Sequence, residues 1–212
     1  METVVLRVHP AVPDPEAIRR AAQAIRRGEL VAFPTETVYG LAAAAFDADA
    51  VARVFEVKGR PANNPLPVQV GSADDISGVA VDIPDAAWEL IRRFMPGPLT
   101  IVLRASPDLP ETVTAGTGTV GVRIPNHPVA LALIRAAGRP IVAPSANPSG
   151  EPPPTSAEEV LAYLDGRIEY ILDAGPTQLK VASTVVDLTC APPRILRHGA
   201  IGDEDLAPFL NH

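Results

Sequence analysis

Short apolar segments typical of β-strands alternate with amphipathic segments typical of α-helices along almost the whole chain. The helix over 14–28 is the clearest, because Asp14 can cap its N-terminus, Pro15 occupies the first helical position and Gly28 ends the apolar pattern. Similar patterns predict helices over 47–59, 84–97, 127–138 and 155–166, and a short helix or a frayed tail over 203–210. Strands are predicted over 3–8, 29–34, 66–70, 99–105, 120–125, 139–144, 167–172, 183–189 and 193–199.

This alternation predicts a mixed α/β (α+β) fold with a central sheet and helices on its faces. The connection between 183–189 and 193–199 is too short for a helical crossover, so these strands must pair antiparallel and the sheet is expected to be mixed. The 24 prolines are spread over many short loops and indicate turns within a folded unit. With 212 residues and no internal repeat, we expect one domain.

The charge and cysteine content exclude several classes of protein. A formal net charge of −7 argues against broad electrostatic binding to nucleic acid or to an anionic membrane surface. Cys190 is the only cysteine, so neither an intrachain disulfide nor a cysteine-based zinc site can form. We find no signal-peptide pattern and no apolar run of membrane-spanning length, and we expect a cytoplasmic protein without a membrane partner.

Common catalytic signatures do not account for the chain. The segment "GTGTVG" (116–121) matches the dinucleotide pattern G-x-G-x-x-G but leads into a predicted strand, where that pattern requires a helix. The P-loop, zincin and nucleophile-elbow motifs are absent. The histidines have no metal-ligand spacing; His127 fits a capping turn and the terminal pair a solvated position, and the full set is His9, His127, His198 and His212. We therefore predict no protein-built metal site.

Polar side chains follow several predicted strands and helices. Lys58 lies at the end of the helix 47–59 and Arg60 on the stiff glycine- and proline-containing loop that follows, and Ser145 and Asn147 follow the strand 139–144. Ser183 and Arg197 add a hydroxyl and a further fixed charge at the ends of the last two strands. Together these groups predict an anion-binding site built from several loops at one edge of the sheet.

The segment "PTETVYG" (34–40) has two interpretations. Its threonine hydroxyls can cap a helix that runs into the apolar "GLAAAAF", or they can form a ligand-binding turn past the carboxyl end of the strand 29–34. The residues alone leave both open.

Larger segments resemble the YrdC-like family, the L-threonylcarbamoyladenylate synthases of the TsaC type, in order and spacing over roughly residues 14–202. A K-x-R motif followed by an S-x-N motif is the hallmark of that family. The similar segments are "FPTETVYGLAAAAFDADAVARVFEVKGRPANNPLPVQV", "MPGPLTIVL", "TVGVRIPNHPVALALI", "APSANPSGEPPPTSAEEV" and "STVVDL" with "ILRHGAI".

The resemblance implies a fold and a reaction. The fold is a single three-layer YrdC-like domain over 1–212, with a twisted mixed sheet and without the C-terminal domain of the longer branch of the family. The reaction converts L-threonine, bicarbonate or CO2, and ATP into threonylcarbamoyl-AMP and pyrophosphate. Mg2+ is expected with the ATP, held mainly by the phosphates. The product would pass to the machinery that transfers threonylcarbamoyl to the tRNA adenosine next to the anticodon.

The resemblance also implies roles for individual residues. Contacts to ATP are implied for Lys58, Arg60, Asn64, Thr119, Ser145, Asn147 and Arg197, with Lys58, Arg60, Ser145 and Asn147 acting in catalysis. Contacts to threonine are implied for Thr35, Tyr39, Gln69, Arg123 and Ser183. Two positions depart from the family: Gln69 stands where many relatives have histidine, and "KVAST" with Lys180 and Ala182 replaces "GVEST".

Two alternatives to this function remain. Related domains have been regarded as RNA-binding modules, which would imply weak RNA binding, although the acidic balance and the 4% of aromatic residues weigh against it. A carbamoyl-adenylate-forming domain of the hydrogenase-maturation type would start from carbamoyl phosphate, but those proteins carry zinc-finger and acylphosphatase units that are not found here.

Overall fold

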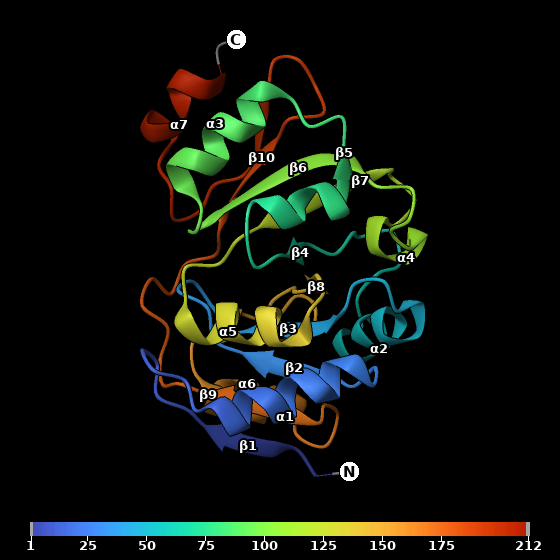
Figure 1. Ribbon diagram of the computed structural model, residues 1–212, viewed down its shortest axis with the longest axis vertical. Coiled ribbons are helices and arrows are strands. Elements are labelled where there is room, and N and C mark those ends of the chain that lie inside the picture. The colour runs from blue at the N-terminus through green and yellow to red at the C-terminus, as the bar shows by residue number, and fades with distance from the viewer. Residues whose placement is uncertain (1, 211–212) are drawn as a thin grey trace.

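A computed structural model describes residues 2–210 of the chain (Figure 1). The helices are α1 (Pro15–Arg26), α2 (Ala48–Lys58), α3 (Asp85–Phe94), α4 (Glu111–Thr114), α5 (Pro128–Ala137), α6 (Ala157–Leu164) and α7 (Asp203–Leu210), with a 3-10 helix, η1 (Asp74–Gly78). The strands are β1 (Val4–Arg7), β2 (Val31–Phe33), β3 (Gly40–Ala44), β4 (Val68–Gln69), β5 (Ala80–Val81), β6 (Leu99–Ala105), β7 (Thr119–Arg123), β8 (Ile141–Val142), β9 (Tyr170–Asp173), β10 (Thr184–Asp187) and β11 (Arg194–Arg197). His212 lies outside the described residues.

The strands form one continuous path of hydrogen-bonded neighbours, in the order β1-β9-β2-β3-β8-β4-β7-β6-β10-β11, with β5 beside β6. Pairing is parallel for β1 with β9, β9 with β2, β4 with β7 and β6 with β10, and antiparallel for the remaining neighbours. The prediction of a mixed sheet is confirmed. The last two strands, β10 and β11, form the antiparallel pair that their short connection required.

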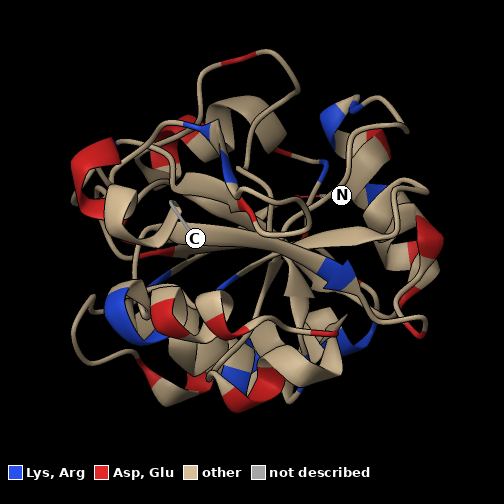
Figure 2. Ribbon diagram, turned by 90° about the horizontal axis from the view of Figure 1, so that it is seen from above, with Lys and Arg blue, Asp and Glu red and all other residues tan. Residues whose placement is uncertain are grey.

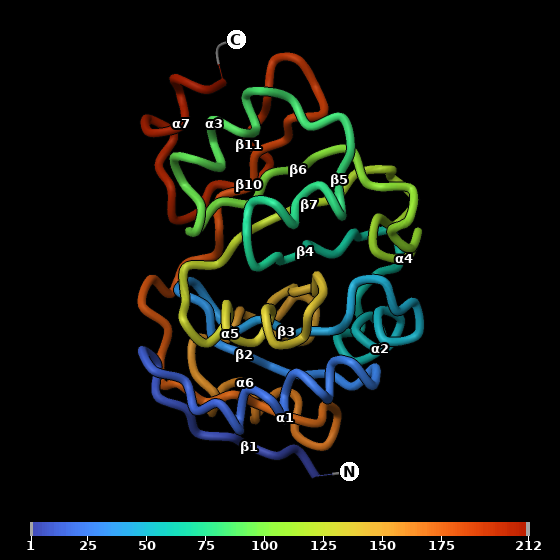
Figure 3. The backbone as a smooth tube through the Cα atoms, in the orientation of Figure 1, coloured from blue at the N-terminus to red at the C-terminus, as the bar shows by residue number. Residues whose placement is uncertain are grey.

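Two very short strands, β8 and β4, join the two halves of this path at the middle of the molecule (Figure 3). In β8, Val142 lies opposite Ala43 of β3 on one side and opposite Val68 of β4 on the other. The chain therefore leaves the sheet at its centre directly after β4 and β8. The loop before β4 carries Arg60 and Asn64, and the loop after β8 carries Ser145 and Asn147.

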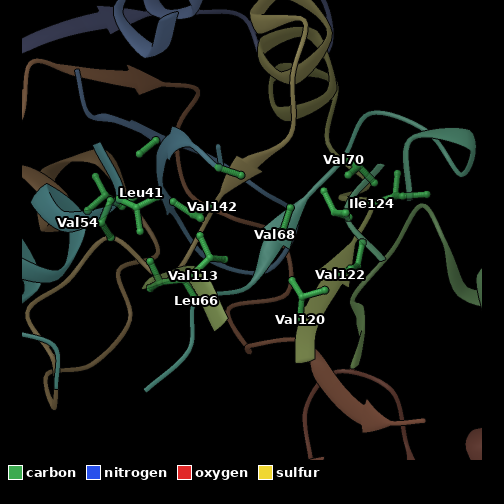
Figure 4. Packing of buried hydrophobic residues seen from close by; sticks show 14 of the residues in the cluster. Leu41, Val54, Leu66, Val68, Val70, Val113, Val120, Val122, Ile124 and Val142 are labelled. Atoms are coloured by element: carbon green, nitrogen blue, oxygen red, sulfur yellow. The ribbon is translucent and has the colours of Figure 1, made fainter. Parts of the chain in front are cut away.

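Helices cover both faces of the sheet, as the alternation of strand and helix patterns predicts. On one face α1 and α5 pack against alternate residues of the central strands, such as Val31, Ala42 and Ile141. The opposite set of strand residues packs against α2, α3, α6 and α7 in a second cluster. Figure 4 shows part of that second cluster, in which Val68 and Val122 of neighbouring strands lie among the buried side chains.

Segment 40–44 is a strand, which overturns the interpretation of "PTETVYG" as a helix N-terminus. The five residues of β3 are all buried, because β2 and β8 flank the strand and side chains of both core clusters cover its faces. This packing outweighs the helical preference of its alanines. The Thr35 hydroxyl accepts hydrogen bonds from the backbone N–H groups of Thr37 and Val38 and so closes a turn.

The remaining differences from the sequence-based prediction are short elements. The helix α4, the 3-10 helix η1 and the strand β5 have too few residues to produce a periodic pattern. Segment 203–210 forms the helix α7, which buries Leu206 and brings Phe209 to 5.7 Å from Phe94, measured between ring centroids. Among the helices of residues 2–210, none combines the length and apolar character needed to cross a bilayer.

Candidate active site

A cavity of about 550 Å³ lies where the central strands β4 and β8 end, within the usual size range of ligand pockets. Its wall is drawn from segments that are far apart in the sequence: the end of α2 with its loop, the strands β4, β6 and β7, the loop after β8, and the hairpin β10–β11. Of the residues predicted for the site, Lys58, Arg60, Asn64, Gln69, Arg123, Ser145, Asn147, Ser183 and Arg197 line this one cavity.

Lys58 is the last residue of α2 and is almost fully buried. Its Nζ donates hydrogen bonds to the backbone oxygens of Ser145 and Asn147, both at 2.5 Å, and the Lys58 backbone oxygen accepts from the N–H of Ser149 at 2.7 Å. Burial, together with the neighbouring Arg60, lowers the pKa of Lys58 to about 8. The hydrogen bonds of Lys58 thus connect the end of α2 to the loop after β8.

Arg60 is held by the loop on which it lies. Its Nε donates to the backbone oxygen of Asn64 at 2.9 Å, and its Nη2 donates to the Asn64 side chain and to the Pro65 backbone oxygen, both at 2.8 Å. Gly59 makes this turn possible, because it adopts a left-handed φ of 58° directly after α2. The guanidinium is therefore fixed in place before any ligand binds.

Arg123, at the end of β7, is paired with a buried carboxylate. Its Nη2 lies 2.6 Å from Glu36 Oε1, its Nη1 donates to the Thr37 hydroxyl at 3.0 Å, and its Nε donates to the Gly97 backbone oxygen at 3.1 Å. Both side chains of the ion pair are less than one-tenth exposed. The second Glu36 oxygen accepts from the backbone N–H of Asn126, so the carboxylate is held on both sides.

Arg197 is anchored on Ser183. The Arg197 Nε donates to the backbone oxygen of Ser183 and its Nη2 to the Ser183 hydroxyl, each at 3.0 Å. The same hydroxyl lies 2.8 Å from Thr100 Oγ1. These hydrogen bonds link Arg197 of β11, Ser183 just before β10 and Thr100 of β6 at the cavity wall.

The cationic side chains Lys58, Arg60 and Arg197 each have a lowered pKa. Desolvation lowers the pKa of Arg60, and the positive charge of Arg197 lowers it further. Desolvation likewise lowers the pKa of Arg197, and the positive charge of Arg123 adds to this effect. Glu151 is the one carboxylate among the described residues that line the cavity. Away from this cavity, Figure 2 shows acidic and basic segments interspersed over helices and loops. A concentration of like charge in a chain of net charge −7 costs stability and favours an anionic ligand.

Two buried acceptors in the cavity wall have no hydrogen-bond partner among residues 2–210, namely Gln69 Oε1 and Asn147 Oδ1. The side-chain nitrogen of Asn147 already donates to the backbone oxygens of Pro148 and Glu151. Asn147 therefore offers an acceptor to the cavity. This acceptor suits a sugar hydroxyl or a metal-bound water.

Three predicted residues do not line the cavity: Thr35, Tyr39 and Thr119. The Thr35 hydroxyl donates to the backbone oxygen of Val38 within its own turn. Tyr39 is buried in the core, and its hydroxyl donates to the Gly175 backbone oxygen at 2.7 Å. Thr119 begins β7, and its hydroxyl bonds to that of Thr117. Thr35 still acts on the wall indirectly, through its 2.9 Å bond to the cavity-lining Thr37 hydroxyl.

Sequence reasoning missed two groups that shape the site, Glu36 and Thr100. Glu36 lies between two threonines in "TET", where a carboxylate looks like an ordinary turn residue. Thr100 lies inside the apolar strand pattern 99–105 and carries no local signal at all. The position of Thr100 beside Ser183 follows only from the parallel pairing of β6 with β10.

The histidines behave as the sequence predicts where they are described. His127 is the N-cap of α5 and its Nδ1 accepts from the backbone N–H of Val129. His9 accepts two backbone hydrogen bonds at the surface. No group of three or more histidine, cysteine, aspartate or glutamate side chains within residues 2–210 could hold a metal ion.

Comparison with known proteins gives a consistent result. A family model for Sua5, YciO and YrdC proteins, described as "Telomere recombination", matches residues 23–199. The threonylcarbamoyl-AMP synthase of Pyrococcus abyssi is 50% identical over 208 residues, which cover 98% of this chain and 61% of that protein. The enzyme of the same name from Bacillus subtilis is 50% identical over 198 residues, covering 93% and 57% of the two chains.

The fold agrees with the sequence comparison. The crystal structure of Pyrococcus abyssi Sua5 complexed with L-threonine superposes with a TM-score of 0.96 at 49% identity, over 99% of this chain and 61% of that one. The chain thus spans about three-fifths of the length of these relatives, and its fold is the one found in Sua5 structures.

Proposed function

The chain belongs to the Sua5/YciO/YrdC family, and we propose that it is an L-threonylcarbamoyladenylate synthase that makes threonylcarbamoyl-AMP and pyrophosphate. The substrates are L-threonine, bicarbonate or CO2, and ATP. One observation carries the proposal: Lys58, Arg60, Arg123 and Arg197 converge on a single cavity in an otherwise acidic protein. Such an arrangement suits a ligand with several negative charges.

The reaction needs stabilisation of charge more than it needs a protein nucleophile. The threonine nitrogen first takes up CO2 and loses a proton to form a carbamate. A carbamate oxygen then forms a bond to the α-phosphorus of ATP, while the bond from that phosphorus to the bridging oxygen breaks and pyrophosphate leaves. Negative charge builds on the phosphoryl oxygens in the transition state, where fixed cations lower the barrier.

The ATP phosphates bind, in this proposal, at Lys58, Arg60 and Arg197. Arg60 and Arg197 are held by hydrogen bonds to their own segments, so they lose little freedom when a ligand binds. The Ser145 hydroxyl, which has no hydrogen-bond partner among residues 2–210, remains available to the nucleotide. Asn64 contributes mainly by holding Arg60.

L-threonine binds, in this proposal, at Arg123, Ser183 and Gln69. The similar Sua5 structure is a complex with L-threonine, which supports this choice of amino acid. Arg123 is oriented by Glu36 and presents a guanidinium, the natural partner of a carboxylate. Gln69 Oε1 is buried without a partner and can accept a hydrogen bond from the substrate.

Mg2+ is proposed to enter with ATP, bound mainly by phosphate and water oxygens. The cavity wall fits this role, because it offers side-chain oxygens, among them Asn147 Oδ1 and the Glu151 carboxylate, that would suit such an ion. The ion would reduce repulsion between the phosphates and the carbamate.

The product would serve tRNA modification in the cytoplasm. A carbamoyl adenylate is a reactive mixed anhydride, so a second protein must accept it and transfer the threonylcarbamoyl group to the tRNA adenosine. ATP, bicarbonate and tRNA occur together in that compartment.

Product formation by the purified protein tests the proposal. The protein is incubated with ATP, Mg2+ and bicarbonate, with L-threonine, L-serine or no amino acid; pyrophosphate is measured by an enzyme-coupled assay and the adenylate by mass spectrometry. We expect both products only when L-threonine and bicarbonate are present.

Pyrophosphate release without an amino acid, or no release with L-threonine, would contradict the proposal. A parallel reaction with carbamoyl phosphate in place of bicarbonate covers the alternative of the hydrogenase-maturation type. Formation of a carbamoyl adenylate in that reaction alone would replace our proposal with that alternative.

A further inference from the structure

We propose that Thr100 is a positioning residue for the amino-acid substrate, because its hydroxyl fixes the Ser183 hydroxyl as a hydrogen-bond donor toward the cavity. The inference rests on the proposed function, since it assigns the bound group at Ser183 as the substrate carboxylate. Thr100 was not predicted from the sequence, and neither the comparisons nor the motifs assign it a role.

The geometry around Ser183 leaves little freedom. Ser183 and Thr100 both line the cavity, and both are at least nine-tenths buried, with exposed fractions of 4% and 5%. Their hydroxyl oxygens lie 2.8 Å apart. The Ser183 oxygen also accepts a hydrogen bond from Arg197 Nη2 at 3.0 Å.

The number of protons limits these bonds to two arrangements. A hydroxyl has one proton and two lone pairs, and arginine can only donate, so Arg197 occupies one lone pair of Ser183. If Thr100 donates to Ser183, the second lone pair is also occupied and the Ser183 proton is left to point into the cavity. If Ser183 donates to Thr100 instead, the Thr100 proton is the one left without an acceptor among residues 2–210, and a Ser183 lone pair faces the cavity.

The charge of the cavity favours the first arrangement. Its wall carries four cationic side chains, so the bound groups are anionic and accept hydrogen bonds. A Ser183 hydroxyl that donates a hydrogen bond strengthens the binding of an anionic ligand. A Ser183 lone pair that faces the same ligand would repel its negative charge. Thr100 therefore orients Ser183 for an anionic oxygen.

The carboxylate of the amino acid is the anionic group that fits this position. Ser183, Arg197 and Arg123 line the same cavity, Arg197 donates to the Ser183 hydroxyl, and the positive charge of Arg123 contributes to lowering the pKa of Arg197. A planar carboxylate between Arg123 and Ser183 would receive donors on both oxygens. Loss of the Thr100 hydroxyl should therefore weaken amino-acid binding more than ATP binding.

A double-mutant cycle tests the inference. KM and kcat for L-threonine are measured at saturating ATP and bicarbonate for the wild type, Thr100→Val, Thr100→Ser, Ser183→Ala and the double variant Thr100→Val/Ser183→Ala. We expect Thr100→Val to raise KM for threonine about fivefold and to change kcat and the KM for ATP less than about twofold. Thr100→Ser should restore the wild-type KM.

The double variant gives the decisive comparison. Because Thr100 acts through Ser183, adding Thr100→Val to Ser183→Ala should change KM less than about twofold. Thr3→Val is the matched control, since Thr3 is a buried threonine beside the edge strand β1 that donates to the Ile168 backbone oxygen, and its KM should equal that of the wild type.

Several outcomes would overturn the inference while leaving the proposed function intact. Effects that multiply in the double variant would mean that Thr100 contacts the substrate by itself. A Thr100→Val enzyme with the wild-type KM would mean that Ser183 needs no orientation, and an unchanged KM in Ser183→Ala would mean that the carboxylate binds elsewhere. A wild-type protein without pyrophosphate release would instead refute the proposed function.

Discussion

Individual charges in this cavity are removed from water in two different ways. Lys58 is buried with backbone oxygens as its hydrogen-bond partners and with a like charge nearby, so its pKa falls to about 8. Arg123 is buried with a carboxylate partner, Glu36, at 2.6 Å. Burying the charged form of Lys58 is costly, and an anionic ligand would offset that cost. The buried charge of Arg123 is already offset by Glu36 within the protein.

The pH dependence of stability tests the state of Lys58. The folded protein loses this proton near pH 8 and the unfolded chain near the ordinary value of 10.5, so the unfolded state binds more protons between these values. The free energy of unfolding should therefore gain a contribution on the order of 3 kcal/mol as pH rises through this window.

Denaturant titrations between pH 7 and 11 provide the measurement. Lys58→Met should lose the rise, because its side chain cannot titrate. Lys180→Met removes the other lysine of the chain, which is exposed, and should keep the rise. Identical pH profiles for the wild type and Lys58→Met would show that Lys58 keeps an ordinary pKa.

Glu36→Gln should strongly destabilise the protein, because it leaves the buried Arg123 charge without its partner. We expect a loss of about 3–5 kcal/mol in the free energy of unfolding by denaturant titration at pH 7. The matched control is Asp82→Asn, which breaks an exposed ion pair with Arg104 and should cost less than about 1 kcal/mol. Equal costs for the two substitutions would contradict the role of Glu36.

The sequence predicts part of this residue-level arrangement. Lys58, Arg60, Ser145 and Arg197 stand out because cations and hydroxyls on proline-rich loops have little structural explanation, and they do meet in the cavity. Tyr39 could not be placed, since its neighbours in the sequence do not determine which layer its side chain enters. The role of Glu36 could not be predicted, because it depends on an ion pair with Arg123, which follows 87 residues later.

At the scale of elements, the ends of short strands and one tight hairpin shape the site. The helix bounds follow from capping residues, as in α1, where Asp14 accepts from the backbone N–H of Ala17 and Pro15 begins the helix. The strand β3 could not be predicted from its sequence, because its alanines favour a helix until neighbouring strands bury them. The secondary structure of such segments is determined by pairing with strands that are distant in the sequence.

Gly199→Ala should disrupt the hairpin that positions Arg197 and Ser183. A Cβ atom at position 199 would lie 2.4 Å from the backbone oxygen of Ala182 and 2.5 Å from the carbonyl carbon of Ser183, so backbone must move. We expect kcat/KM for pyrophosphate release to fall at least about tenfold, because small displacements of binding groups have large effects on rate.

The control for this substitution is Gly78→Ala. A Cβ atom at position 78 would meet nothing within 4 Å, so activity should stay at the wild-type level. Wild-type activity in Gly199→Ala would mean that the segment 182–183 tolerates displacement and that the hairpin does not position the site.

At the scale of the whole molecule, the cavity lies where the two halves of the sheet meet. The strands β4 and β8 join the halves through a few residue pairs, the loop before β4 carries Arg60, and the loop after β8 carries Ser145 and Asn147. The strand β1 and the helix α7 lie at opposite ends of the long axis of the molecule in Figure 1. That the chain functions as one YrdC-like domain remains a prediction.

The rate of pyrophosphate release by Arg60→Ala is the most direct test of the central claim that this cavity carries the reaction. Arg60 lies on a loop and outside the core, so the variant should fold, which its thermal unfolding curve would verify. We predict that kcat/KM for ATP, with L-threonine and bicarbonate present, falls at least about 100-fold, while the surface control Arg104→Ala keeps the wild-type value. A folded Arg60→Ala enzyme with normal turnover would contradict the account.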